Sequence, residues 1–328
     1  SAVLPQSRPG ALRSLCPTTL APGPGAAHGG EHGGLAERRA VTAMSQLQMT
    51  RGVFDNSMAY ARWGEGAKTV LFVPGGPGNT LPEGPLRRVG GPLFRPLVEA
   101  GYAVWAVTRP RNLPDGYSIE DMSDDYAAVI AAEFGGRVDI ALGSSMGGMI
   151  VQYLAANHPD RAETFVVLGA ACGLTEWTKA LLRRDAAAVA SGDRTERGLI
   201  AAEALLPGRS LGWLRRLLVP LTARMSDWMT GSAEHKYFEH DYAIEADAAM
   251  QFDSRETLPH IRVPVLLING DRDRHSPRDM VEPTAQLIPD CTLVWYPGKG
   301  HDATCASTRL GPVILDYINQ RSAHSDAS

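Results

Sequence analysis

The chain has 328 residues, of which 44% are hydrophobic and 21% are charged, as in ordinary globular proteins that dissolve in water. A net charge of −4 excludes the basic surface that nucleic-acid binding requires, and no apolar run is long enough to span a membrane. The four cysteines lie far apart, which argues against a zinc cluster or a disulfide framework and favours a reducing, cytoplasmic location.

The two ends of the chain differ from the rest in composition. Residues 1–45 are rich in proline, glycine and alanine without hydrophobic periodicity, so we expect a disordered tail. They contain no continuous apolar stretch with basic flanks and a cleavage site, so we do not expect a signal peptide. Residues 323–328 are assigned to a second, short tail.

Short apolar strands and amphipathic helices alternate between these tails. A hairpin is expected over residues 47–63, with Asp55-Asn56 at its turn. Further strands are predicted at residues 69–73, 102–107, 139–142, 164–168, 263–268 and 292–296. Helices are predicted at residues 92–100, 118–135 and 310–318, and another directly follows the strand at 139–142. This alternation predicts a mostly parallel sheet with helices on both faces.

The alternation stops over residues 173–255, which are mainly helical and contain no buried-strand pattern. We expect this segment to form a helical lid after the sixth strand, inserted into one core made of residues 46–172 and 256–322. Each of its large apolar side chains is consistent with packing between lid helices, but as a group they favour an apolar pocket wall. These side chains are Trp177, Trp213, Leu214, Leu217, Leu218, Leu221, Met225, Trp228, Met229, Tyr237, Phe238 and Tyr242.

The stretch Gly143-Ser144-Ser145-Met146-Gly147 fits the pattern G-x-S-x-G between a predicted strand and a predicted helix. A strand that turns at once into a helix holds its middle residue, Ser145, in a strained and exposed position, and the two glycines leave room for the chain crossing. The helix N-terminus adds free N–H groups and the positive end of a dipole. This context predicts that Ser145 is a nucleophile.

A serine nucleophile needs a base, and the base needs an acid that orients it. In a parallel sheet we expect these groups at the carboxyl ends of the late strands. Asp271 and Asp273 follow the next-to-last predicted strand, and His301 follows the last one. The spacing Gly-x-x-Asp from Gly270 favours Asp273 as the acid, with Asp271 as the competing candidate. Along the chain, the order serine, aspartate, histidine is the one that accompanies a G-x-S-x-G serine at such a strand-to-helix turn.

Backbone N–H groups are expected to bind the oxyanion. One belongs to Met146, the residue after the nucleophile, and the other to Gly76 in the glycine loop that follows the strand at 69–73, with Gly75 as the alternative. Pro77 has no N–H group to donate. A phosphate-binding loop is a weak interpretation of these glycines, because no Gly-Lys-Ser/Thr follows them.

Together these motifs resemble the α/β-hydrolase fold superfamily in its serine-triad branch, over residues 47–320. The resemblance implies an eight-stranded, mostly parallel sheet with a lid after the sixth strand, and it implies no metal or organic cofactor. The elbow around Ser145 and residues 154–161 are similar to the carboxylesterase and enol-lactonase branch, whereas the loop at 74–78 resembles the proline iminopeptidase branch.

We therefore expect a serine hydrolase that cleaves a small or medium carboxylic ester or lactone, with Ser145, His301 and Asp273 as its triad. Three alternatives stay open. An aminopeptidase would need lid carboxylates near the pocket, for which Glu234, Glu239 and Asp241 are available. A cofactor-free lyase or C–C hydrolase would use the same triad, and a non-catalytic ligand-binding module would use none of it.

Overall fold

The computed structural model describes residues 47–78, 81, 90–206, 211–230 and 236–325. The predicted N-terminal tail, residues 1–45, lies outside the described residues, as do residues 326–328. Helix α11 (Leu310–Ser325) includes the first part of the predicted C-terminal tail. The sequence has no glycine or proline after Val313 that would end this helix earlier.

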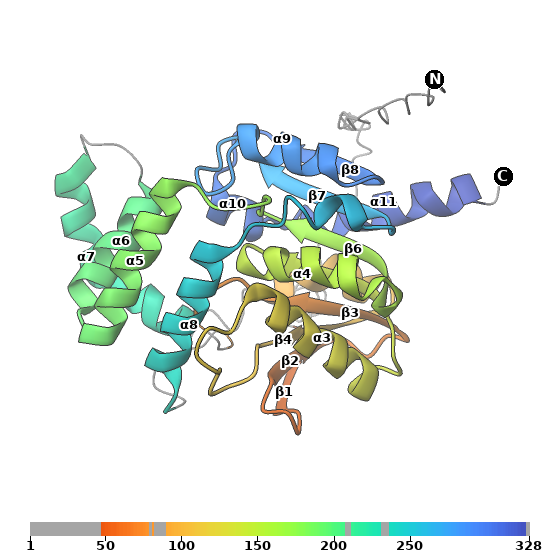
Figure 1. Cartoon of the computed structure of the whole chain (residues 1–328), viewed down its shortest axis with the longest axis horizontal. Coiled ribbons are helices and arrows are strands. Elements are labelled where there is room, and N and C mark those ends of the chain that lie inside the picture. The colour runs from red at the N-terminus through yellow and green to blue at the C-terminus, as the bar shows by residue number, and fades with distance from the viewer. Residues whose placement is uncertain (1–46, 79–80, 82–89, 207–210, 231–235, 326–328) are drawn as a thin grey trace, which may run out of the picture.

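One eight-stranded sheet forms the centre of the structure, in the strand order β1-β2-β4-β3-β5-β6-β7-β8 (Figure 1). The predicted hairpin pairs β1 with β2 antiparallel, β2 is also antiparallel to β4, and the other neighbours are parallel. The mostly parallel sheet predicted from the sequence is therefore confirmed. The strands are β1 (Met49–Val53), β2 (Ala59–Trp63), β3 (Lys68–Val73), β4 (Tyr102–Val107), β5 (Val138–Ser144), β6 (Ala162–Leu168), β7 (Val265–Gly270) and β8 (Cys291–Tyr296).

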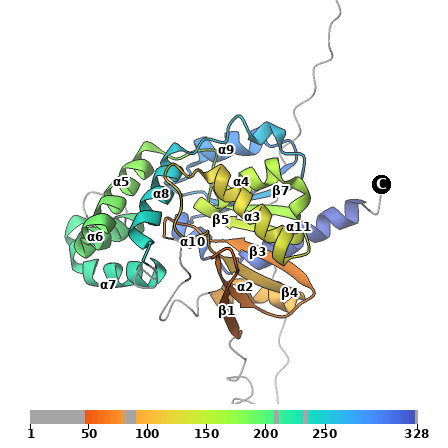
Figure 2. The same ribbon diagram turned by 60° about the horizontal axis from the view of Figure 1, so that its bottom comes forward.

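Helices cover both faces of the sheet and enclose two apolar cores (Figures 1 and 2). Successive residues of β5 alternate between these cores: Ala141 packs on one face, Ile140 and Leu142 on the other. Helices α2 and α11 cover the face of Ile140, and α3, α4 and α9 cover the face of Ala141. Their bounds are α2 (Gly90–Glu99), α3 (Ile119–Glu133), α4 (Met146–Asn157) and α9 (Arg278–Leu287), with short helices η2 (Pro159–Arg161), η4 (Leu258–His260) and α10 (His301–Cys305) between elements.

Four helices follow β6 and lie together beside one end of the sheet (Figure 1). They are α5 (Glu176–Ser191), α6 (Arg194–Leu205), α7 (Gly212–Thr230) and α8 (Phe238–Gln251). They occupy the segment for which the sequence predicts a lid, and the division into core and lid stays a prediction. Within the described residues, no helix is both long and apolar enough to cross a bilayer.

Helix α8 is tied to the sheet by hydrogen bonds to the loop after β4. The carboxylate of Asp241 accepts the backbone N–H groups of Asn112 at 3.0 Å and Leu113 at 2.9 Å. The imidazole of His240 contacts the Leu113 carbonyl oxygen at 2.9 Å. Because Asp241 is buried, these bonds hold one helix of the segment firmly against the sheet.

The glycines around Ser145 are required by two close backbone crossings. A Cβ atom on Gly143 would lie 2.1 Å from the carbonyl oxygen of Gly147, and one on Gly147 would lie 2.1 Å from the carbonyl oxygen of Val73. Both distances are far below van der Waals contact, and the opposing atoms belong to the backbone. The turn from β5 into α4 therefore packs against the end of β3 only when these positions lack side chains.

Replacing Gly147 by alanine should lower the free energy of unfolding by more than about 2 kcal/mol, because the backbone at Val73 must move to admit the methyl group. The matched control is Gly212→Ala, since a Cβ atom on Gly212 meets nothing within 4 Å. Urea unfolding of both variants measures the difference. Equal stability of the two variants would contradict the crossing described above.

Candidate active site

Ser145 lies where β5 ends and α4 begins, at the carboxyl edge of the sheet. Its backbone has φ 55° and ψ −119°, in a region that non-glycine residues adopt only when the surrounding structure holds them there. The Ser145 N–H group donates to the carbonyl oxygen of Leu168 at 2.8 Å, which ties the turn to β6. Helix α4 starts at Met146, directly after Ser145, so the turn is as abrupt as the motif requires.

The structure brings the three predicted triad residues into one hydrogen-bonded chain. Nε2 of His301 lies 3.0 Å from Oγ of Ser145, and Nδ1 of the same ring lies 2.7 Å from Oδ2 of Asp273. Asp273 follows β7, and His301 is the first residue of α10 after β8. Residues far apart in the sequence thus meet at one edge of the sheet, in the geometry that proton transfer from a serine needs.

Asp273, and not its rival Asp271, contacts the histidine. The second oxygen of Asp273 accepts the backbone N–H groups of His275 at 2.8 Å and Ser276 at 3.1 Å, so this buried carboxylate is held at both oxygens. Asp271 instead accepts the N–H group of Gly298 at 2.6 Å and joins the loops after β7 and β8. Asp271 therefore has a contact within the loops and none with the histidine among the described residues.

Asp273 raises the pKa of His301. Burial of the imidazole lowers this pKa and is the largest single effect, but the hydrogen bond and charge of Asp273, together with the charge of Asp302, outweigh it. The net pKa of His301 is therefore above its usual value of 6.5. A raised pKa makes the ring a stronger acceptor for the proton of the Ser145 hydroxyl.

Both candidate oxyanion donors line the cavity next to Ser145. Met146 is the first residue of α4, so its N–H group has no acceptor within the helix. Gly75 and Gly76 also line the cavity, and a Cβ atom on Gly75 would lie 3.8 Å from the Ser145 Oγ. The loop after β3 therefore passes directly beside the hydroxyl group, and the choice between its two glycines stays a prediction.

A buried ion pair that sequence reasoning missed holds this loop in place. The guanidinium of Arg109, after β4, contacts the carboxylate of Glu245 on α8 at 2.6 Å and 3.1 Å. Its Nη1 also donates to the Pro74 carbonyl oxygen at 3.1 Å, and Glu245 accepts the Gly78 N–H group at 2.8 Å. Both side chains are at most 1% exposed, so they bind the two ends of the loop from inside the molecule.

The loop also explains why position 76 is a glycine. A Cβ atom there would lie 2.7 Å from Nη2 of Arg109. The guanidinium thus occupies the space that a side chain at this position would need. No local pattern marks Arg109 and Glu245 in the sequence, because they are separated by 136 residues.

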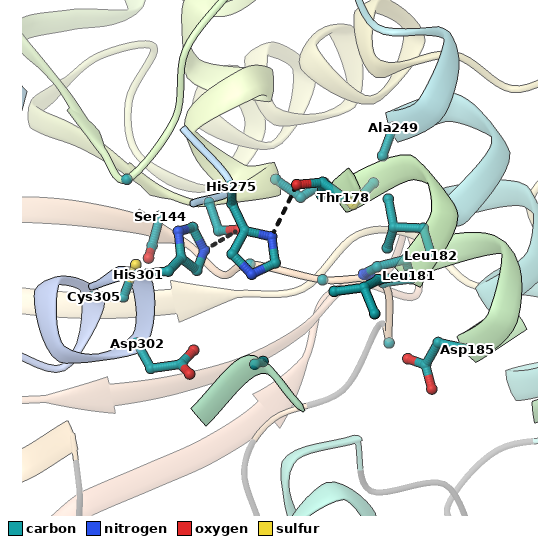
Figure 3. Close-up of a pocket in the computed structure, with 18 of the residues that line it drawn as sticks. Ser144, Thr178, Leu181, Leu182, Asp185, Ala249, His275, His301, Asp302 and Cys305 are labelled. Atoms are coloured by element: carbon teal, nitrogen blue, oxygen red, sulfur yellow. Dashed lines mark hydrogen bonds between the residues drawn. The ribbon is translucent and has the colours of Figure 1, made fainter. Parts of the chain in front are cut away.

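A cavity of about 420 Å³ lies above Ser145 and His301. Most of its lining is apolar, with Met146 and Met149 from α4, Leu181 and Leu182 from α5, and Ile200 from α6. Asp185, Arg197 and Asp302 add charged groups to the lining. Figure 3 shows Asp185 and Asp302 well separated within it. The cavity fits a mostly apolar organic molecule of small or medium size.

The apolar wall predicted from the sequence is wrong in its members. Of the proposed side chains that the structure describes, only Tyr242 lines the cavity. Trp213, Leu217 and Leu221 are instead 69%, 69% and 56% exposed. The side chains of Trp228 and Met229 lie outside the described residues.

Helix α7 turns its small side chains inward, which explains the exposed stripe. Thr222 of α7 donates to the Gly198 carbonyl oxygen of α6 at 2.7 Å, and a Cβ atom on Gly198 would lie 3.0 Å from Ala223. Such close helix packing needs small residues on both sides. Trp213, Leu217 and Leu221 lie on the opposite, exposed face of α7.

His275 is a second pocket residue that the sequence analysis did not assign. Its ring lies 4.5 Å from the ring of His301, measured between centroids, and its Nδ1 lies 3.3 Å from Oγ1 of Thr178 on α5. Figure 3 shows it between these two residues. Burial, with the nearby His301, lowers the pKa of His275 to about 4, so the ring is neutral near pH 7. The position two residues after Asp273 was the only signal in the sequence.

Cys305 also lines the cavity, where a thiol could compete as a nucleophile. Burial raises the pKa of its thiol to about 12. The reactive thiolate is then absent near neutral pH. Cys305 therefore acts as a small packing residue.

A model of the alpha/beta hydrolase family matches residues 70–307, more than half of the chain. A protein of Methanothermobacter thermautotrophicus named "Probable acyltransferase" is 28% identical over 282 residues, which cover 81% of this chain and 86% of that protein. The pimeloyl-(acyl-carrier protein) methyl ester esterase of Neisseria meningitidis is 29% identical over 218 residues, which cover 63% of this chain and 64% of that protein. The crystal structure of the enol-lactonase from Burkholderia xenovorans LB400 has a TM-score of 0.60 at 20% identity, over 82% of this chain and 100% of that one. The predicted fold class is therefore confirmed.

Replacing Glu245 by leucine leaves the buried Arg109 without its carboxylate and should lower the free energy of unfolding by about 3–5 kcal/mol. The double variant Arg109→Met with Glu245→Leu removes both charges and should lose less than the single variant. Denaturant unfolding measures both. Asp290→Ala, which breaks the exposed pair with Arg321, is the control, with an expected loss of at most about 1 kcal/mol. A Glu245→Leu variant as stable as this control would contradict the described role of the pair.

Proposed function

Because this chain belongs to the alpha/beta hydrolase family, we propose that it is a serine hydrolase that cleaves a small or medium carboxylic ester or lactone. The observation that carries the proposal is the continuous contact from Ser145 Oγ through His301 to Asp273, at 3.0 Å and 2.7 Å. Such a chain of groups is what makes a serine hydroxyl nucleophilic near neutral pH. The proposal further treats residues 173–255 as a lid over a core of residues 46–172 and 256–322.

In this proposal Ser145 Oγ attacks the carbonyl carbon of the substrate while Nε2 of His301 accepts the hydroxyl proton. His301 then gives this proton to the alcohol oxygen as the bond from carbon to that oxygen breaks, which leaves an acyl-enzyme. A water molecule loses a proton to His301 and attacks the acyl carbon. Ser145 regains its proton as the carboxylic acid leaves. Asp273 orients the ring and stabilises its protonated form.

The negative oxygen formed in each attack would bind the N–H groups of Met146 and Gly76. Both residues line the cavity beside Ser145, and the positive end of the α4 dipole lies at the same place. The Arg109–Glu245 pair supports this role because it fixes the loop that carries Gly76. A preorganised donor of this kind contributes about 3–4 kcal/mol to transition-state stabilisation.

The mostly apolar cavity and the relatives together favour an ester or lactone over other substrates. Relatives include a methyl ester esterase and a structural neighbour that is an enol-lactonase. An aminopeptidase is less well supported, because Asp241 is buried under Asn112 and Leu113, and Glu239 does not line the cavity. Glu234 lies outside the described residues. No observation favours a lyase, a C–C hydrolase or a non-catalytic module over the ester hydrolase.

Ser145→Ala should abolish both ester turnover and labelling by a fluorophosphonate probe, because the nucleophilic oxygen is lost. The neighbouring serine provides the control: Ser144→Ala should keep the label, since Ser144 ends β5 before the turn. Gel fluorescence reports labelling, and product release from a panel of esters and lactones reports turnover. Ester turnover that survives in Ser145→Ala refutes the proposed nucleophile, and an unlabelled wild-type protein favours a ligand-binding module.

Activity should fall on the acid side of the His301 pKa, because only the neutral ring accepts the serine proton. Asp273→Asn removes the bond and charge that raise this pKa, so the acid limb of the kcat/KM profile should move to lower pH. The same change should lower kcat about 10⁴-fold, because an amide at this position holds the imidazole in the wrong tautomer. Asp302→Asn removes a charge that raises the pKa of His301 by less than Asp273 does, so the acid limb should move to lower pH by a smaller amount. A limb that moves to higher pH in either variant contradicts this electrostatic account.

A further inference from the structure

His275 is held beside His301 by contacts from three directions. Its backbone N–H group donates to the same Asp273 carboxylate that contacts His301. Its ring packs against the His301 ring, and the indole of Trp177 meets it edge-on at 5.0 Å between centroids. The ring therefore has little freedom to turn, and its position relative to His301 is set by the loop that carries Asp273.

One ring nitrogen of His275 is occupied, and the other is available to the cavity. Nδ1 faces Oγ1 of Thr178, and that hydroxyl also lies 2.8 Å from Oγ1 of Thr175. Figure 3 shows the ring directed into the cavity, with only one nitrogen turned toward Thr178. In the part of the chain that the structure describes, Nε2 makes no hydrogen bond, although His275 lines the cavity.

The hydroxyls of Thr175 and Thr178 can hold His275 in the tautomer that carries its proton on Nε2. Oγ1 of Thr175 already accepts the backbone N–H group of Thr178 at 3.1 Å. If Thr175 donates to Thr178, and Thr178 donates to Nδ1 of His275, every hydroxyl proton of the chain has an acceptor. The ring is neutral near pH 7 and has one N–H group, and in this arrangement that group lies on Nε2, the nitrogen that faces the cavity.

We propose that the Nε2–H group of His275 binds a second, uncharged oxygen of the leaving alcohol, so that the preferred substrates are esters of vicinal diols or of their monoethers. This inference rests on the proposed ester hydrolysis. His301 gives its proton to the ester oxygen of the leaving alcohol, and the neighbouring ring lies only 4.5 Å away. An oxygen on the next carbon of that alcohol lies within reach of the second ring. The carboxylate of Asp302 lines the same cavity near His301 and disfavours an anionic group beside that ring, whereas Asp185 faces Arg197 at 3.7 Å.

Two esters of equal size test the proposal. Butyl butanoate and 2-methoxyethyl butanoate differ only by a methylene group in place of an ether oxygen in the alcohol. For the wild-type protein, kcat/KM should be about five- to tenfold higher for the methoxyethyl ester, the size of one neutral hydrogen bond. His275→Phe keeps a ring but loses both nitrogens, so the ratio of the two values should fall to about one. A loss of activity common to both esters cancels in this ratio.

Three further variants separate recognition from structure. His275→Gln keeps an amide donor and should retain part of the preference, which also serves the test if the phenylalanine variant fails to fold. Thr178→Val removes the partner of Nδ1 and should weaken the preference. His260→Phe, at an exposed histidine remote from the cavity lining, should keep the wild-type ratio.

A wild-type ratio near one overturns the proposal, and so does a His275→Phe variant that keeps the wild-type ratio. In either case the proposed ester hydrolysis still holds if both esters are cleaved in a Ser145-dependent way. If the wild-type protein cleaves neither these esters nor any other ester or lactone, the proposed function itself is contradicted, and this inference with it.

Discussion

The backbone contact between Gly147 and Val73 sets the geometry of the whole candidate site. It brings the start of α4 against the end of β3 with no side chain between them. Ser145 lies shortly before Gly147 in the chain, and the loop with Gly75 and Gly76 follows Val73. The distance between hydroxyl group and loop is therefore decided by atoms of the main chain. Close-packed protein interiors have low compressibility, which makes this contact a rigid reference for the other groups.

Near this rigid contact two charged side chains are buried, which carries a large desolvation free energy. Arg109 and Glu245 are buried, and the desolvation of two such ions is repaid only when the remaining donors and acceptors also find partners. Here those partners are the Pro74 carbonyl oxygen and the Gly78 N–H group, at the two ends of the loop beside Ser145. An apolar pair of the same size could fill the space but could not bind the loop. We infer that the pair is retained for the position it gives to the loop.

Local patterns were enough to predict the sheet and the three polar residues at its edge. The strands are apolar runs bounded by turn residues. Ser145 directly follows β5, Asp273 comes three residues after the end of β7 at Gly270, and His301 five residues after the end of β8 at Tyr296. Contacts between distant segments could not be predicted in this way. Nothing near Arg109 in the sequence indicates Glu245, and the role of His275 depends on Thr178 of another helix. Trp213, Leu217 and Leu221 lie on an exposed face of α7, and the sequence of a helix alone does not say which of its apolar residues another element covers.

The position of Glu245 has a consequence for how this protein can diverge. The segment between β6 and β7 supplies the counter-ion for Arg109, which follows β4 of the central sheet. In a chimera that received this segment from another hydrolase, the Arg109 guanidinium would lack a carboxylate partner unless the new segment had an acidic residue at the position equivalent to Glu245. Positions 109 and 245 are thus expected to change together or not at all, and recombination breakpoints should spare the helix that carries the acid.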